Sequence, residues 1–295
     1  MPLVAMKDLI AHARAKRYAV GAYQVVDSSF VGAVIAAAER ERAPVILGFV
    51  QAHAAHYDCE ALFHAARSAA RRASVPVALL FDHASDDAAI DAAIGLGCQG
   101  VMADFAALPF AANVAATRAV AARVHAHGLL VEGELGYVPG VLGDEAALHP
   151  GRMHLTDPEE AARFVAATGV DCLAVAVGNV HGHPLRAPTL ELDRLEAVAA
   201  AAAVPLALHG GSGLAEEDYR ALIERGVAKI NYFTALSDVA AGAASAALAD
   251  IEAGYLQAID AVRAAVATET ARSLQLFGAS GQAPSALAAC RRIDG

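Results

Sequence analysis

Eight short apolar runs alternate with longer helix-forming stretches along this chain of 295 residues. The runs span residues 18–25, 44–50, 75–83, 100–105, 129–136, 172–178, 204–211 and 228–234. Their nearly continuous hydrophobicity is typical of parallel strands that are buried on both faces. The helix-forming stretches lie at 28–42, 60–73, 85–96, 109–127, 157–168, 189–202 and 215–225. Eight successive strand-then-helix units favour a closed (β/α)8 barrel, the TIM barrel, over an open doubly wound α/β sheet.

Two segments depart from this regular alternation. Residues 137–155 contain several glycines and prolines and are longer than a plain connection, which is typical of a mobile active-site loop. After the eighth run, an alanine-rich helical region covers about residues 236–272. Because no internal repeat or interdomain linker interrupts the chain, we expect a single TIM-barrel domain over residues 1–295, with 236–295 as a C-terminal helical extension.

The composition argues against several classes of protein. A formal net charge of −10 and the lack of a basic patch argue against nucleic acid as a partner. The longest apolar stretch, 197–208, contains Pro205 and is shorter than the roughly 20 residues of a membrane-spanning helix. The four cysteines form no CxxC pair, which argues against thiolate zinc and against a disulfide framework. With no signal-peptide pattern at the start, we expect a cytoplasmic protein with no membrane partner.

Histidines occur at the carboxyl ends of three predicted strands, and in a barrel these ends converge on one site. They are His83, His181 and His209; His183 lies further from its strand and is a weaker candidate. A single histidine usually bonds locally, but three at equivalent strand ends predict a catalytic zinc site with an open position. We expect several other histidines, which fall in helices or loops, to lie on the surface: His53, His56, His64, His125, His127 and His149.

A glycine-rich turn, HGGSG at 209–213, follows the seventh predicted strand. Successive glycine N–H groups and a serine hydroxyl can cradle a phosphate, although the same residues can form an ordinary turn before a helix. TIM barrels commonly bind phosphate after strands seven and eight, where Asn231 and Thr234 also lie. The turn is therefore a candidate anion site.

Carboxylates accompany these histidines. Asp82, next to His83, is a candidate general acid/base, or alternatively a partner that orients the ligand. Glu132 and Glu134 face the same side of one strand, and two charges inside a barrel need a cation or a polar partner. At least one of them is therefore expected to support the metal site or the loop.

These residues belong to motifs that resemble those of the class II, metal-dependent fructose-bisphosphate and tagatose-bisphosphate aldolases, particularly the short tagatose-type branch. The resemblance covers nearly the whole chain: YAVGAY, PVALLFDH, VMAD with LPF, VEGELG, TDPEEA, AVAVGNVHG, PLALHGGSG, KIN with a following T, and LFGASGQA. The order of the histidine motifs is highly specific for this superfamily.

The resemblance implies a lyase that reversibly cleaves a ketose phosphate to dihydroxyacetone phosphate and an aldehyde. Zinc, or another divalent ion, would be held by His83, His181 and His209 as a Lewis acid. Asp82 would move the proton of the hydroxyl whose carbon–carbon bond breaks. Asp104 and Glu134 would support the ligands or bind a second metal ion. The positions that match those holding dihydroxyacetone phosphate are Gly182, Gly211, Ser212, Gly213, Asn231 and Thr234. Family members of this kind imply a homodimer or homotetramer.

The chain also departs from the family pattern. The strand-eight motif NVDTD reads Asn-Tyr-Phe-Thr-Ala at 231–235, so both aspartates are absent. The family's DHG reads Asp-His-Ala at 82–84, its IDGS reads Ala-Asp-Phe-Ala at 103–106, and its strand-one asparagine is Gln24. The loop acid expected to abstract a proton falls on Leu142, and a shift of the loop would bring Asp144 or Glu145 there instead.

Losing these carboxylates makes the substrate site less polar, and a site without partners for sugar hydroxyls should reject ordinary sugar bisphosphates. We therefore expect an aldolase with an atypical substrate, whose aldehyde half is less hydroxylated or more apolar. One alternative is a zinc barrel that enolises or epimerises a non-phosphorylated substrate, although HGGSG argues against it. Another is a non-catalytic metal-binding homologue, which the missing loop acid favours and the intact Asp82 opposes.

Overall fold

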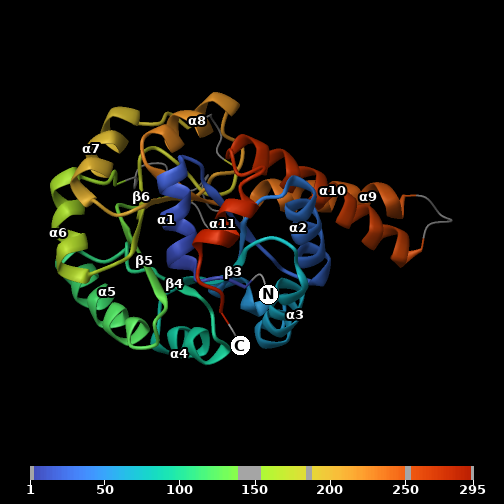
Figure 1. Ribbon diagram of the computed structural model, residues 1–295, viewed down its shortest axis with the longest axis horizontal. Coiled ribbons are helices and arrows are strands. Elements are labelled where there is room, and N and C mark those ends of the chain that lie inside the picture. Colours follow the sequence, from blue (N-terminus) through green and yellow to red (C-terminus); the bar gives the residue numbers. More distant parts are fainter. Residues whose placement is uncertain (1–2, 139–153, 184–187, 250–253, 294–295) are drawn as a thin grey trace.

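The strands form a closed, fully parallel barrel in the computed structural model, which describes residues 3–138, 154–183, 188–249 and 254–293 (Figure 1). Neighbouring strands pair in chain order, and β8 closes the barrel by pairing with β1. The strands are β1 (Val20–Gln24), β2 (Val45–Val50), β3 (Val77–Ala84), β4 (Gly100–Ala103), β5 (Leu130–Leu135), β6 (Cys172–Val175), β7 (Leu206–Leu208) and β8 (Val227–Tyr232). The predicted TIM barrel is thus confirmed.

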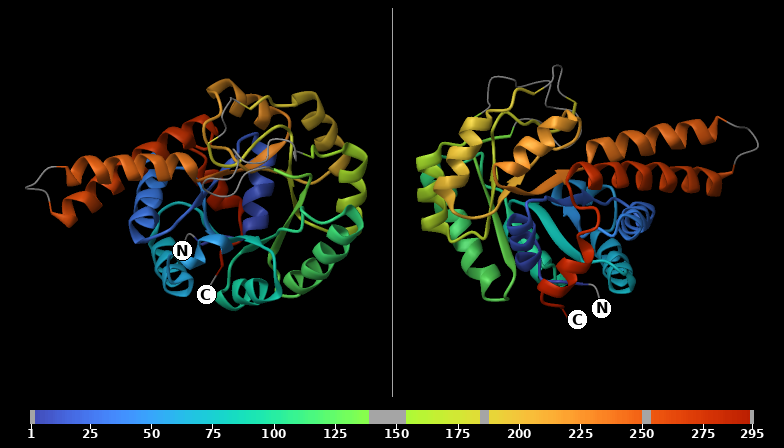
Figure 2. Two further views of the ribbon diagram at one scale, coloured as in Figure 1. Left: turned by 180° about the vertical axis from the view of Figure 1, so that it is seen from behind. Right: turned by 45° about the horizontal axis from the view of Figure 1, so that its top comes forward.

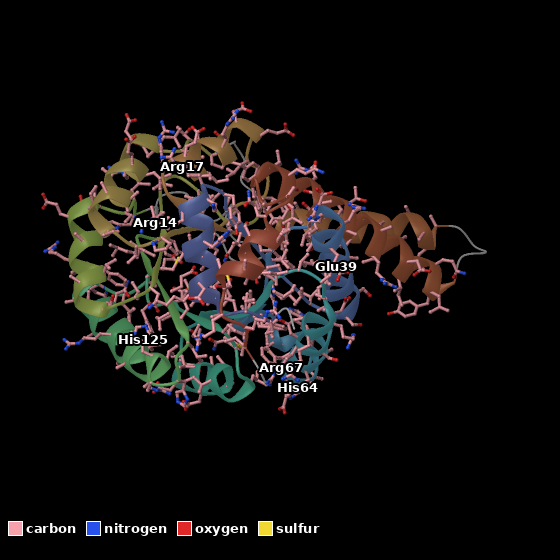
Figure 3. The ribbon with its side chains drawn as sticks, in the orientation of Figure 1. Arg14, Arg17, Glu39, His64, Arg67 and His125 are labelled. Atoms are coloured by element: carbon pink, nitrogen blue, oxygen red, sulfur yellow. The ribbon has the colours of Figure 1, made fainter. Side chains whose placement is uncertain are left out.

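Helices surround the barrel as an outer ring (Figures 1 and 2). They are α2 (Ser28–Glu41), α3 (Cys59–Arg72), α4 (Asp87–Leu96), α5 (Phe110–His125), α6 (Pro158–Thr168), α7 (Leu192–Ala202) and α8 (Glu216–Glu224), with a 3-10 turn η1 (Gln51–Ala55) after β2. Figure 3 shows that polar side chains such as Arg67 and His125 come from this ring. Because every strand lies between the ring and the barrel interior, its residues are almost all buried, as the apolar runs predict.

One end of the barrel is covered by both termini of the chain. Leu3 pairs with Val77, the first residue of β3, and the backbone N–H of Ile293 donates to Leu3. Helix α1 (Met6–Lys16), which the sequence analysis did not predict, follows Leu3 and lies near α11 (Ala283–Ala289) in Figure 1. These elements cover the amino-terminal ends of the strands, so the site must form at the carboxyl ends.

The predicted helical region at 236–272 consists of two helices. Helix α9 (Thr234–Leu248) and helix α10 (Tyr255–Leu276) run side by side and project beyond the ring in both views of Figure 2. Three large apolar side chains are exposed toward their outer ends: Leu248, Tyr255 and Leu256. Across the described ranges, we find no helix with the length and hydrophobicity that crossing a bilayer requires.

Candidate active site

The three histidines predicted as metal ligands come together at the carboxyl ends of the strands. The ring centroids of His83 and His209 are 4.9 Å apart, those of His83 and His181 5.6 Å, and those of His181 and His209 5.9 Å. One nitrogen from each ring lies within 4.8 Å of the others, close enough for the set to hold a metal ion. Three imidazoles of this kind suit a catalytic zinc, which keeps one coordination position open.

Carboxylates determine which ring nitrogen of His83 and of His209 faces the cluster. His83 Nδ1 lies 2.8 Å from Asp104 Oδ2, and its Nε2 is buried without a hydrogen-bond partner. His209 Nε2 lies 2.8 Å from Glu132 Oε1, and its Nδ1 is buried without one, 3.6 Å from Glu134 Oε2. Since each carboxylate accepts the ring N–H, each opposite nitrogen keeps its lone pair for a metal.

The backbone at His83 departs from ordinary strand geometry. Its φ of +54° is rare for a residue other than glycine and costs about 1–2 kcal/mol. The pairing of β3 with β4 also shifts register between Phe81 and Ala84, on either side of it. Strain of this kind persists where the surroundings hold it in place, commonly at functional sites.

A buried ion pair supports His209 from inside the barrel. Lys229 and Glu132 are fully buried, and Lys229 Nζ lies 2.9 Å and 2.8 Å from the two oxygens of Glu132. Burial alone would lower the pKa of Lys229, but the Glu132 charge outweighs it and raises that pKa, so the lysine is charged. The sequence analysis gave Lys229 no role, although a single lysine within an apolar strand was a visible signal.

The pKa values of the cluster describe its metal-free state. Burial lowers the pKa of His83, but the charges of Asp82 and Asp104 outweigh that effect and raise it to about 9. Burial, together with the charge of Asp104, raises the pKa of Glu134 well above its usual value. Burial and then the Lys229 charge lower the pKa of His209 well below 6.5. A metal ion that binds His83 must therefore displace its proton, whereas the lowered pKa of His209 favours the neutral form that binds a metal.

Asp82 lies beside the histidines and is fully buried. Its Oδ2 accepts hydrogen bonds from Gln24 Nε2 at 2.6 Å and from Asn231 Nδ2 at 2.8 Å. Its Oδ1 is buried and has no hydrogen-bond partner. One oxygen is thus fixed by two amides while the other can accept a proton, an arrangement that suits a general acid/base.

The residues predicted to hold a phosphate are only partly brought together. A narrow cavity is lined by Gly182, Ser212, Asn231 and Thr234, and also by Phe233 and Gly210. Gly211 and Gly213 are absent from its lining. The N–H of Gly211 donates to the carbonyl of Asn231, and a Cβ at this position would meet that oxygen at 2.8 Å. Gly211 therefore allows β7 and β8 to approach closely and has no N–H left for an anion.

A second, larger cavity of about 510 Å³ opens on the other side of the histidines. Asp104 and Glu134 both line it, together with His83 and His181. These two carboxylates and His83 also form a second group whose donor atoms lie within 4.8 Å of one another. The loop residues Leu142, Asp144 and Glu145 lie outside the described residues, as do most of 137–155 and His149.

The prediction of a surface position was wrong for one histidine. His56, His64, His125 and His127 are exposed, but His53 is only 8% exposed. The ring of His53 packs against Phe233, with centroids 4.8 Å apart. Because Phe233 occupies a position where the related family has an aspartate, this apolar contact replaces a carboxylate beside the site.

Comparisons with known proteins agree with this geometry. Residues 4–282 match the family model described as "Fructose-bisphosphate aldolase class-II". A probable fructose-bisphosphate aldolase of Bacillus subtilis is 35% identical over 288 residues, covering 96% of this chain and all of that one. The crystal structure of the YdjI aldolase from Escherichia coli K12 matches with a TM-score of 0.86 at 33% identity, over 95% of this chain and 99% of the other.

A third likeness is to the crystal structure of a putative fructose-1,6-biphosphate aldolase from Coccidioides immitis. Its TM-score is 0.87 at 30% identity, over 95% of this chain and 98% of that one. The match of the family model and the relatives' coverage extend over nearly the whole barrel, including every strand that contributes to the site. The chain therefore belongs to the class II fructose-bisphosphate aldolase family and is a carbon–carbon lyase.

Proposed function

We propose that the protein is a metal-dependent aldolase that reversibly cleaves a ketose phosphate to dihydroxyacetone phosphate and an aldehyde. The observation that carries this proposal is the convergence of three imidazoles on one point beside the free Oδ1 of Asp82. A binding protein without chemistry would have no need to keep a buried carboxylate oxygen without a partner, because such an atom destabilises the fold.

The metal site consists of His83, His181 and His209, and we propose zinc as its ion. The donor set fits, since His83 and His209 each have one nitrogen held by a carboxylate and the other without a hydrogen bond. A bound zinc ion would supply Lewis-acid polarisation of the substrate carbonyl. Asp104 and Glu132 keep the two rings in the required tautomer.

Asp82 is the proposed acid/base on the aldehyde side of the reaction. In cleavage, its Oδ1 takes the proton of the hydroxyl whose carbon becomes the aldehyde carbon; in condensation, it returns that proton. Gln24 and Asn231 hold the carboxylate in place through Oδ2. Because Asp82 is fully buried, water competes little for this proton.

The phosphate of dihydroxyacetone phosphate is proposed to bind in the narrow cavity. The Ser212 hydroxyl and the Thr234 side chain supply polar groups there, and Gly182 permits close approach of the backbone. The cavity volume of about 20 Å³ has room for about one water molecule, so phosphate binding requires Phe233 or the glycine-rich turn to move. The substitution of the family's two aspartates at 233 and 235 supports an atypical substrate.

Proton exchange into dihydroxyacetone phosphate tests this proposal without knowledge of the aldehyde. In deuterated water, the zinc-loaded protein should exchange a carbinol proton of the compound, as followed by proton NMR. His209→Ala should abolish the exchange because it removes a ligand. The matched control is His183→Ala, since the His183 side chain is 62% exposed and contacts Asp238 rather than the triad.

Asp82→Asn separates the two halves of the reaction. The variant should keep the exchange but lose condensation with aldehydes by about 10²- to 10⁴-fold, the usual contribution of a positioned acid/base. No exchange in fully metallated wild-type protein would overturn the proposed function.

We also propose that the protein is a cytoplasmic homodimer or homotetramer. Leu248, Tyr255 and Leu256 support an assembly, because each is at least 58% exposed on the projecting α9–α10 pair. Light scattering after size-exclusion chromatography measures the mass directly, and a monomer at micromolar concentration would contradict this proposal.

A further inference from the structure

The larger cavity beside the histidines is acidic. Two carboxylates, Asp104 and Glu134, line it, and its other polar groups include Gln51 and Ser85. No lysine or arginine of the residues that the structure describes lines this cavity. A phosphate dianion placed here would meet two carboxylates without a lysine or arginine to offset them, which is unfavourable away from bulk water.

Two neutral polar groups at the rim, Gln51 and Ser85, already bond to each other. Gln51 Oε1 accepts hydrogen bonds from the Ser85 N–H at 2.9 Å and from the Ser85 hydroxyl at 3.3 Å. The amide of Gln51 donates to Asp86 Oδ2 at 2.6 Å. Gln51 therefore accepts both hydrogen bonds that Ser85 could otherwise donate to a phosphate.

The amino terminus of helix α4, just after Ser85, already has a capping carboxylate. Helix α4 starts after Asp86, whose Oδ1 accepts the N–H of Ala89 at 2.9 Å and caps the helix. The amino terminus of a helix attracts anions, but here the aspartate already supplies the negative charge. A substrate phosphate at this end of the cavity would have to displace a carboxylate that is part of the protein.

The narrow cavity on the other side of the histidines likewise has no lysine or arginine among its described lining residues, but its polar groups are of a different kind. None of the described residues that line it has a carboxylate; they offer the hydroxyls of Ser212 and Thr234 together with glycine backbone at Gly182 and Gly210. The two sides of the site are thus suited to different halves of one molecule. One side, once widened, offers hydroxyls and glycine backbone to a phosphate, and the other offers carboxylates to groups that donate hydrogen bonds.

We propose that the aldehyde partner of this aldolase carries no phosphate and is a neutral, hydroxylated aldehyde, with Gln51 as the specificity-determining residue that closes the second phosphate position. This inference rests on the proposed aldolase function. In the condensation, carbon 3 of dihydroxyacetone phosphate loses a proton and forms a bond to the aldehyde carbon, while the aldehyde oxygen takes up a proton. No oxidant or reductant is needed, and the product is a ketose with a single phosphate.

A competition between two aldehydes that differ only in a phosphate tests the inference. Zinc-loaded protein and dihydroxyacetone phosphate are incubated with glyceraldehyde or with glyceraldehyde 3-phosphate, and product formation is followed by NMR. We expect kcat/KM for glyceraldehyde to exceed that for the phosphorylated aldehyde by at least ~10-fold, because like charges and occupied donors oppose the phosphate. Exchange of the carbinol proton is measured in the same samples.

The outcomes separate this inference from the proposed function. Exchange together with equal or faster turnover of glyceraldehyde 3-phosphate would overturn the inference and leave the aldolase intact. Exchange without condensation of either aldehyde would overturn the inference too, because neutral aldehydes would then not be substrates. Absence of exchange would overturn the proposed function and the inference with it.

A double variant tests the role of Gln51. Gln51→Ala with Asp86→Ser frees the donors of Ser85 and removes the carboxylate from α4, while serine remains a good helix cap. We expect the preference for glyceraldehyde, given as the ratio of the two kcat/KM values, to fall at least ~3-fold. The matched control is Gln257→Ala with Asp58→Ser, which changes an exposed glutamine and another helix cap, neither of which lines the cavity. An unchanged preference in the first variant would contradict the role of Gln51.

Discussion

His83 and His209 reach the same point of the site but are held in different ways. His83 is held by Asp104, whose side chain is 31% exposed, and its backbone is strained. His209 is held by Glu132, which is fully buried with Lys229 as its partner. The first contact can be weakened by solvent, whereas the second cannot be broken without leaving a charge inside the barrel. The contact of Asp104 with His83 therefore affects mainly the metal site, whereas the contact of Glu132 with His209 also affects the stability of the fold.

Removing the buried cation should have the largest effect. Lys229→Met leaves the Glu132 carboxylate buried without a cation, which should lower the free energy of unfolding by about 3–5 kcal/mol. Urea unfolding of metal-free protein, monitored by circular dichroism, measures this change. Lys7→Met is the comparison, because the Lys7 side chain is 70% exposed in its ion pair with Asp171. This substitution should lower the free energy of unfolding by about 1 kcal/mol or less.

The double variant Glu132→Gln with Lys229→Met distinguishes a lost charge pair from lost packing. It removes both charges, so most of the stability lost in Lys229→Met should return. If the double variant is as unstable as Lys229→Met, packing rather than the unpaired charge would explain the loss.

The support of His83 should matter for metal binding and little for folding. Asp104→Asn removes the charged acceptor at Nδ1 while keeping a similar shape, and we expect zinc affinity to fall by about 10- to 100-fold. Competition with a chelator measures the affinity, and urea unfolding of the metal-free variant should change by about 1 kcal/mol or less. Unchanged affinity would mean that Asp104 does not orient His83 for a metal.

The fold was predictable because one physical signal repeats along the chain. Strands buried on both faces must be apolar throughout, so all eight runs correspond to observed strands. The region at 236–272 gave no such signal. Its alanines favour helix almost everywhere, so the pattern does not show where α9 ends. Gly254, which directly precedes α10, is a helix-breaking residue near the boundary. Helix α1, MKDLIAHARAK, was missed because it precedes the first strand and lies outside the repeating units.

The site was predictable where function requires a residue at a strand end, and less so where residues support one another in three dimensions. His83, His181 and His209 follow from their positions alone. Lys229 does not, because its partner Glu132 lies 97 residues away in the sequence. The glycine-rich turn suggested that Gly211 could bind a phosphate, but the sequence cannot show that its N–H already donates to the carbonyl of Asn231.

Of the predicted effects, the change in stability of the metal-free protein with pH should be the smallest. Burial opposes the charged form of His83, but Asp82 and Asp104 outweigh it and raise its pKa from 6.5 to about 9. A raised pKa stabilises the fold fully below about pH 6.5, and this contribution is lost as the pH rises to about 9. The raised pKa of Glu134 acts in the same direction, and the lowered pKa of His209 has its effect below pH 6.5.

We therefore expect the Tm of chelator-treated protein to fall between pH 6.5 and pH 9, and to fall less in Asp104→Asn, because that variant loses one of the charges that raise the His83 pKa. Over the same interval zinc affinity should rise, since zinc must displace the His83 proton. Differential scanning fluorimetry across this range measures the first trend and chelator competition the second. A Tm that rises with pH over this interval would mean that His83 is uncharged in the metal-free protein, and the proposed contrast between a charged His83 and a neutral His209 would then be wrong.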